Sequence, residues 1–148
     1  MGFEKLFKTF PMKDLGDVKK CFGLNVIRDR VNRIFTLDQE EYINSILKNS
    51  RMDNCEQCYT PMEKGTNATL TKSESCDISL PYRSLVGSLM YLYQATRPDI
   101  SFAVNILSRF SNCYQQEHWN AGKRVLRYLR GTAHYKFNHT NSFYYTLI

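Results

Sequence analysis

The chain has 148 residues, a length that suits one domain, and its apolar share of 43% is close to the average for globular proteins. It contains no apolar run long enough to span a bilayer, and its first residues mix acidic and basic side chains where a signal peptide needs an apolar run. We therefore expect an intracellular protein, in the cytoplasm or the nucleus, rather than a membrane or secreted one.

The net charge of +6 is concentrated in the second half of the chain. Residues 1–80 contain 12 Lys or Arg and 12 Asp or Glu, whereas residues 81–148 contain eight Lys or Arg against Asp99 and Glu117. A basic half of this kind favours a polyanionic partner, with nucleic acid ahead of an anionic membrane surface. Charge alone says nothing about any preference for a nucleotide sequence.

The first part of the chain predicts two helices with a hairpin between them. Apolar residues at helical spacing indicate the end of a helix over 4–10. Residues 20–37 contain two β-prone stretches joined by a polar turn. This pattern predicts a β-hairpin with Phe22, Leu24 and Val26 alternating on one face. A further helix is expected over 38–50, with Asp38 as its cap and Glu41 completing a capping box.

The rest of the chain predicts a linker, three helices and a β-prone tail. Residues 53–80 are polar and short of large apolar side chains, as in a linker or a long surface loop. Apolar residues at helical spacing then predict helices over 81–95, 97–110 and 118–131, the last closed by Gly131 as a C-cap. The aromatic residues of 135–148 favour strands.

The last predicted helix is basic and has the clearest functional pattern. Lys123, Arg124, Arg127 and Arg130 are its cations, and no acidic residue follows Glu117 on the helix. Lys123, Arg127 and Arg130 recur at i, i+4 and i+7, which places them on one stripe; the inward face is expected to hold Val125, Leu126 and Leu129. Cations near a helix C-terminus also suit the macrodipole. The uneven charge of the chain favours phosphate contact by all four cations.

Residues that often carry chemistry stand here without suitable partners. Cys55 and Cys58 form a CxxC pair, but zinc needs about four ligands and no second pair has a suitable spacing. His118, His134 and His139 have no partner at metal or nucleophile spacing, and His118 is expected to be a packed or partly exposed helix residue. The scattered cysteines favour reduced thiols. We predict no catalytic and no metal-binding residue on this chain.

Six stretches, taken together and in one order across residues 6–132, resemble a known family. They resemble the Pol polyprotein of copia-type long-terminal-repeat retrotransposons. The stretches are "FPMKDLGDVKKCFGLNV", "YINSILKNSRM", "YTPM", "PYRSLVGSLMYL", "ATRPDISFAVNILSRF" and "HWNAGKRVLRYLRGT".

The resemblance implies an α+β fold, mostly helical, that is a fragment of a right-hand polymerase. It implies the end of a palm, a primer-grip-like hairpin and a thumb-like helix over 1–52, then a polar linker over 53–80. A helical connection module follows over 81–132, and a truncated start of a ribonuclease H-like sheet over 133–148. Phe22, Gly23 and Leu24 fall where the family holds the primer end, although Cys21 stands where the family more often has Phe.

The resemblance also implies a function. The family's catalytic aspartates for polymerisation and for ribonuclease H lie outside this sequence, so we expect a reverse transcriptase segment that is inactive alone. The Mg²⁺ of the complete enzyme would not be held here, and no other cofactor is implied. The expected partners are a primer–template duplex, bound without sequence preference, and the missing polymerase and ribonuclease H parts. Two alternatives remain open: an incomplete gene model of an active enzyme, or a captured host module that binds proteins.

Overall fold

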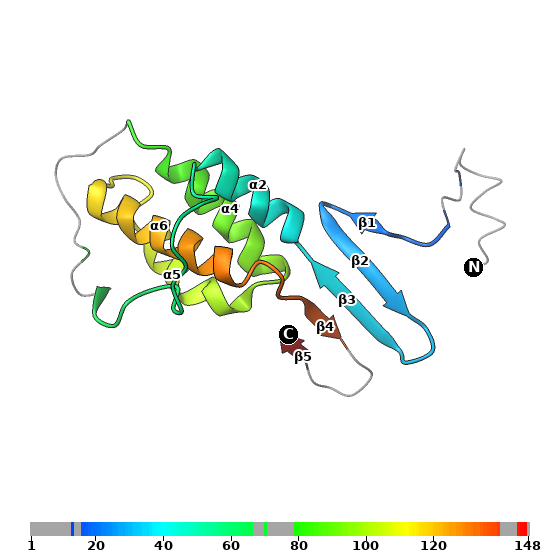
Figure 1. Ribbon diagram of the computed structural model, residues 1–148. Helices are drawn as coiled ribbons and strands as arrows, with labels where there is room; N and C mark the ends of the chain where they lie inside the picture. The colour runs from blue at the N-terminus through cyan, green and yellow to red at the C-terminus, as the bar shows by residue number, and fades with distance from the viewer. Residues whose placement is uncertain (1–12, 14–15, 67–69, 71–78, 140–144, 148) are drawn as a thin grey trace.

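The computed structural model of the protein describes residues 13, 16–66, 70, 79–139 and 145–147, which form an antiparallel sheet beside a group of packed helices (Figure 1). The expected mixed α+β class is therefore confirmed. The helix predicted over 4–10 lies outside the described residues, as do residues 140–144 and 148 of the tail predicted to favour strands.

The sheet joins two parts of the chain that are far apart in sequence. Its order follows the chain, and all its neighbouring strands are antiparallel: β1 (Lys20–Cys21), β2 (Leu24–Asp29), β3 (Ile34–Asp38), β4 (Phe137–His139) and β5 (Tyr145–Leu147). In the β3–β4 pair, Phe35 is opposite His139, and the Thr36 hydroxyl donates a 2.7 Å hydrogen bond to the Asn138 amide oxygen. An isolated two-stranded hairpin is only marginally stable, so β4 stabilises the hairpin by widening its sheet.

The predicted β2–β3 hairpin is confirmed, and a single carboxylate organises its turn. Asp29 Oδ1 accepts hydrogen bonds from the backbone N–H groups of Val31 and Asn32 at 2.9 and 3.0 Å, and the Asn32 side-chain amide donates to Oδ2 at 2.7 Å. The Asn32 hydrogen bonds lower the pKa of Asp29, because they stabilise its charged form. The carboxylate thus closes the turn in place of a backbone ladder.

The predicted helices are present, with shifted ends. They are α2 (Glu40–Asn49), α4 (Tyr82–Ala95), the 3₁₀ turn η1 (Pro98–Ile100) leading into α5 (Ser101–Ser108), and α6 (Gln116–Gly131). The predicted capping box at α2 is wrong, because Gln39 is the N-cap and makes no side-chain cap hydrogen bond. Asp38 ends β3, and its Oδ1 accepts a 2.9 Å hydrogen bond from the Asn25 amide and a longer one, 3.4 Å, from the Glu40 N–H. Glu41 instead forms a 2.5 Å ion pair with Lys20.

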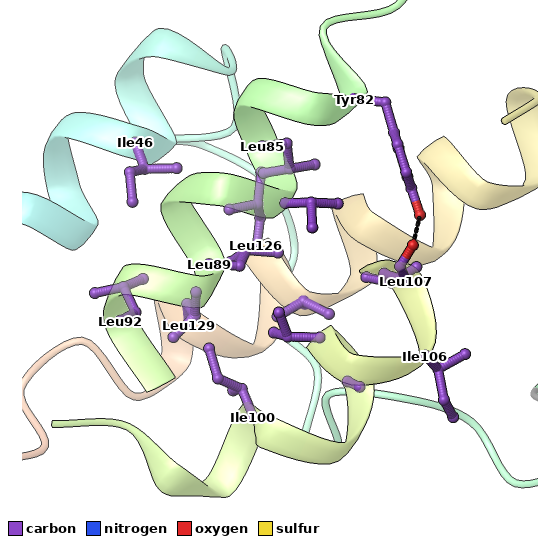
Figure 2. Close-up of a cluster of buried hydrophobic side chains, with 14 of the residues drawn as sticks. Ile46, Tyr82, Leu85, Leu89, Leu92, Ile100, Ile106, Leu107, Leu126 and Leu129 are labelled. Carbon is purple, nitrogen blue, oxygen red and sulfur yellow. Dashed lines mark hydrogen bonds between the residues drawn. The ribbon is translucent and has the colours of Figure 1, made fainter. Parts of the chain in front are cut away.

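The helices α2, α4, α5 and α6 share one apolar core (Figure 2). Ile46 of α2 lies in the same cluster as Leu85 and Leu89 of α4 and Leu126 of α6, so α2 packs with the helices that follow the polar segment. The Tyr82 hydroxyl donates a 2.7 Å hydrogen bond to the Leu107 carbonyl, which ties α4 to α5. Each fully buried large apolar side chain contributes about 1.5–3 kcal/mol, so this core is the main source of stability.

The structure bears on the predictions about membrane spans and about the state of the cysteines. Within the described ranges, no helix combines the length and apolar character needed to cross a bilayer. Cys21, Cys55 and Cys58 are free thiols, whereas Cys113 is disulfide-bonded. The expectation of reduced thiols throughout is therefore wrong at Cys113.

Candidate nucleic-acid interface

Helix α6 is fixed at its start and along its inner face. The Gln115 side chain accepts a hydrogen bond from the His118 N–H, and His118 Nδ1 accepts one from the Gln115 N–H at 3.0 Å, so each residue caps the other. The predicted inward face is confirmed by the complete burial of Val125, Leu126 and Leu129. The candidate cations on α6 are therefore held on the face that does not enter the core.

One of these cations, Arg124, is bound by a segment of the chain itself. Residues 53–64, called the strap below, run across α6 (Figure 1). Arg124 Nη1 forms a 2.6 Å ion pair with Glu63, and its Nη2 donates a 3.1 Å hydrogen bond to the Thr60 hydroxyl. Both acceptors belong to the strap, so part of the segment predicted as a linker or a long surface loop covers the basic helix.

The strap continues along α6 past Arg127 to Gly131. Arg127 Nε donates a 2.8 Å hydrogen bond to the Glu56 carbonyl, and its Nη2 is 3.8 Å from the Glu56 carboxylate. A Cβ atom on Gly131 would lie 3.3 Å from Oε1 of Gln57. The predicted C-cap role of Gly131 is wrong, because Thr132 is the C-cap and Gly131 instead lets the strap approach closely.

The side chains of the other two candidate cations, Lys123 and Arg130, form no hydrogen bond or ion pair with any residue that the structure describes. Lys123 lines an open pocket of about 300 Å³ that has no carboxylate among its lining residues. Arg130 lines a pocket of about 460 Å³ that also contains Glu40 and Asp53, neither of which pairs with it. The positive charge at Lys123 is therefore the less compensated of the two.

Of the primer-grip-like residues, Phe22 and Gly23 lie at a tight turn, and Leu24 begins β2. Cys21 is opposite Leu24, so Phe22 and Gly23 form a two-residue loop between β1 and β2, with φ of 50° and 79°. The prediction that Phe22 alternates within a strand is wrong for this reason. Two positive φ values fit a type I′ turn, in which Asn-Gly is favoured. A phenylalanine, 88% exposed, stands here instead.

Tyr91 of α4 holds this turn against the helices. Its hydroxyl donates a hydrogen bond to the Phe22 carbonyl. A Cβ on Gly23 would lie 3.0 Å from the oxygen of the Tyr91 hydroxyl. The Tyr91 ring also meets Tyr42 of α2 edge to face, with 4.9 Å between ring centroids. The exposed phenylalanine is thus presented on a turn that two helices position.

A buried arginine next to the interface was missed by sequence reasoning. Arg97 is completely buried; its Nε and Nη2 donate to the two Asp99 oxygens at 3.0 and 2.7 Å, and its Nη1 donates to the Thr132 carbonyl at 3.0 Å. Tyr128 donates to Asp99 Oδ2 at 2.8 Å, and burial followed by this hydrogen bond raises the pKa of Tyr128 to about 12. The network joins η1 to the end of α6. Apart from the motif "RPD", nothing in the sequence predicts it.

The histidine and cysteine candidates have packing roles in the structure. His118 is buried and its ring centroid lies 4.3 Å from that of Phe110, which confirms the prediction of a packed helix residue. The Cys58 thiol is 3.4 Å from the carbonyl of Arg124 and so helps to attach the strap. Among the residues that the structure describes, no three His, Cys, Asp or Glu gather in a group that could hold a metal ion.

Comparison with known proteins places the chain in a family. Residues 2–64 match the family described as reverse transcriptase (RNA-dependent DNA polymerase). The retrovirus-related Pol polyprotein from transposon TNT 1-94 of Nicotiana tabacum is 41% identical over 134 residues, covering 86% of this chain and 10% of that protein. The corresponding polyprotein from transposon RE2 of Arabidopsis thaliana is 37% identical over 129 residues, covering 87% of this chain and 9% of that protein.

A shorter relative matches nearly the whole chain. An uncharacterized mitochondrial protein of Arabidopsis thaliana is 39% identical over 139 residues, which are 93% of this chain and 56% of that protein. No solved structure matches the chain. The chain thus spans about 10% of the first Pol polyprotein and 56% of the mitochondrial protein. By sequence it belongs to the copia-type retrotransposon Pol polyproteins, as a segment that overlaps their reverse transcriptase.

Proposed function

We propose that this chain is the thumb and connection segment of a reverse transcriptase and that it holds a primer–template duplex by its phosphate backbone. In this proposal the hairpin and α2 belong to the end of the palm and the thumb, and α4 to α6 form the connection. The strands β4 and β5 begin the ribonuclease H-like part and extend the sheet of the hairpin, because β4 pairs with β3. Polymerisation, ribonuclease H cleavage and the Mg²⁺ that both need belong to the rest of the polyprotein.

The observation that carries the proposal is the unpaired charge of Lys123 and Arg130. The two residues are seven positions apart on α6, which is roughly 10.5 Å along a helix axis. Phosphates of one strand follow each other by about 3.4 Å along a duplex axis, so the two cations match about three phosphate steps. Cations that contact only phosphates bind without reading bases, which suits an enzyme that copies any template.

The turn at Phe22 supports the same proposal. A bulky residue at positive φ is strained, and such strain persists mainly where the residue is needed for function. Phe22 is also exposed, so its ring makes little contribution to the core in return for that strain. An aromatic ring on a hairpin tip can stack on a nucleoside at a strand end. We therefore include Phe22, Gly23 and Leu24 in the proposed interface, as a primer grip.

The charge proposal is tested by the double variant K123Q/R130Q. Loss of two phosphate contacts should weaken binding to a fluorescent primer–template duplex by roughly 10- to 100-fold at about 0.1 M salt. The control is R28Q/R109Q, which removes the same charge from two exposed residues on β2 and after α5. The control should bind within about two-fold of the parent chain. Equal losses in both variants, or no loss in either, would contradict the proposed site.

The turn is tested by F22N, which places a favoured residue at the first turn position. We expect unfolding stability equal to or above that of the parent, since the strain is relieved, but weaker binding to a duplex with a recessed 3′ end. Blunt duplex, which offers no recessed end, should bind both proteins alike. A variant that is more stable and binds the recessed end as well as the parent would remove Phe22 from the interface.

A further inference from the structure

The strap binds two of the four α6 cations that the sequence predicts to contact phosphate. Arg124 binds Glu63 and Thr60, and Arg127 binds Glu56. The strap contains Asp53, Glu56 and Glu63 against one cation, so it is an acidic segment lying on a basic helix. Its contacts with the two guanidinium groups are therefore of the same kind as those of a phosphate backbone.

The strap satisfies these guanidinium groups only in part. Arg124 Nε is buried and has no hydrogen-bond partner within the described residues. Arg127 reaches the Glu56 carboxylate only at 3.8 Å, which is an ion pair without a hydrogen bond. A phosphate group, with its several acceptor oxygens, would satisfy both donors better.

The strap is also held more firmly at its ends than in its middle. Before it, the Met52 N–H donates a 2.8 Å hydrogen bond to the Leu47 carbonyl, and Met52 packs against the core; beyond it, Leu70 is buried in that core. Within the strap, Met62 also packs against the core, whereas Tyr59 is 99% exposed and the Glu56 side chain is 94% exposed. Exposed ion pairs contribute little individually, so residues 53–60 can leave α6 while Met52 and Met62 stay in place. Glu63, whose side chain is 66% exposed, can release Arg124 by rotating its side chain.

From this arrangement we propose that the strap is a built-in competitor of the nucleic acid. With the strap closed, α6 offers Lys123 and Arg130; when a polyanion displaces the strap, Arg124 and Arg127 join them. The inference rests on the proposed function and adds its regulation. The strap lowers the affinity of the chain for a short or weakly bound duplex, and a duplex that contacts all four cations displaces it. Attachment at both ends lets the strap return when the duplex leaves.

A disulfide between strap and helix tests this directly. A Cβ on Gly131 would lie 3.5 Å from the Gln57 Cβ, within the range of disulfides, so Q57C/G131C should lock the strap shut on oxidation. The variant is made in a C21S/C55S/C58S background to remove competing thiols. The same background without the new pair, with and without reductant, controls for reduction at Cys113. Binding of the full chain to a primer–template duplex is then measured against salt.

The reduced form should bind more tightly than the oxidised form. For the reduced form, the slope of log K against log salt should be larger in magnitude than for the oxidised form by up to roughly 1.8, which corresponds to two further phosphate contacts. Equal affinity and slope in the two forms, with K123Q/R130Q still weakening both, would overturn the strap inference and leave the proposed function standing. No duplex binding by either form would overturn both.

A second variant tests the strap without a crosslink. E56Q/E63Q keeps side-chain size and removes the two carboxylates that face Arg124 and Arg127. It should bind duplex more tightly than the parent, and a protease should cut residues 53–64 faster. Faster cutting without tighter binding would show a loosened strap that does not compete, and would overturn the inference.

Discussion

At the residue scale, Arg97 is a buried charged side chain whose stability depends on its partners. It is completely buried, and its charge is balanced by Asp99, whose side chain is 18% exposed. Replacing Arg97 with Met leaves that carboxylate without its partner, which should cost about 3–5 kcal/mol in the free energy of unfolding. Urea denaturation measures the loss, and R109M at an exposed position should stay within about 0.5 kcal/mol. A loss below about 1 kcal/mol in R97M would mean that the pair contributes little.

Tyr128 makes the stability of this network depend on alkaline pH. Its pKa is raised to about 12 in the folded chain, against an ordinary value of 10, so the folded state keeps a proton that the unfolded state releases between these values. Stability from Tyr128 is therefore complete below pH 10 and decreases as pH rises toward 12. Y128F should be less stable than the parent at pH 7, by about 1.5–3 kcal/mol for the lost bond to a carboxylate. The difference in the free energy of unfolding between the parent and Y128F should decrease from about pH 10 upward. A difference that stays constant would contradict the raised pKa of Tyr128.

Single residues were the hardest features to predict from the sequence. The burial of Val125, Leu126 and Leu129 followed from spacing alone, because one helix has one inward face. The partners of Arg124 and Arg127 could not be predicted, because Glu63 and Glu56 lie 61 and 71 positions earlier in the chain. The same holds for Phe22, whose backbone is set by the pairing of Cys21 with Leu24 and by contact with Tyr91.

At the element scale, the contact between α4 and α6 is set by a glycine. A Cβ on Gly122 would lie 2.9 Å from Leu85 Cδ2, whereas a Cβ on Gly87, on the exposed side of α4, would meet nothing within 4 Å. G87A should therefore stabilise the chain by about 0.5–1 kcal/mol through helix propensity. In G122A the same gain is offset by overpacking of about 1–3 kcal/mol. Thermal melts should rank G87A, parent and G122A in that order, and equal gains would show a loose α4–α6 contact.

Elements with a strong local pattern were predicted better than those that depend on distant partners. The β2–β3 hairpin and the helices α2, α4, α5 and α6 followed from apolar spacing, because each element buries one face. The strap was predicted only as part of a linker or a long surface loop, since its contacts with α6 come from carboxylates, a carbonyl and a thiol, and not from apolar periodicity. The pairing of β4 with β3 likewise depends on chain-distant contacts that a single sequence does not indicate.

At the scale of the whole molecule, the helices and the sheet occupy different sides, and the phosphate-contact candidates lie on the helical side (Figure 1). The excess positive charge of residues 81–148 follows from composition, and the structure places two of its unpaired members, Lys123 and Arg130, on α6. A segment with this charge distribution should bind nucleic acid through counterion release and not through base contacts. Its affinity should therefore depend on salt and hardly at all on nucleotide sequence.

The most direct measurement is the salt dependence of duplex binding by the unmodified chain. Two primer–template duplexes of unrelated sequence are titrated by fluorescence anisotropy between about 50 and 200 mM salt. We predict straight lines of log K against log salt, with the same slope for both duplexes and a magnitude of at least roughly 1.8, as two or more phosphate contacts require. A slope near zero, or affinities that differ tenfold between the two sequences, would contradict a backbone-holding role for this chain.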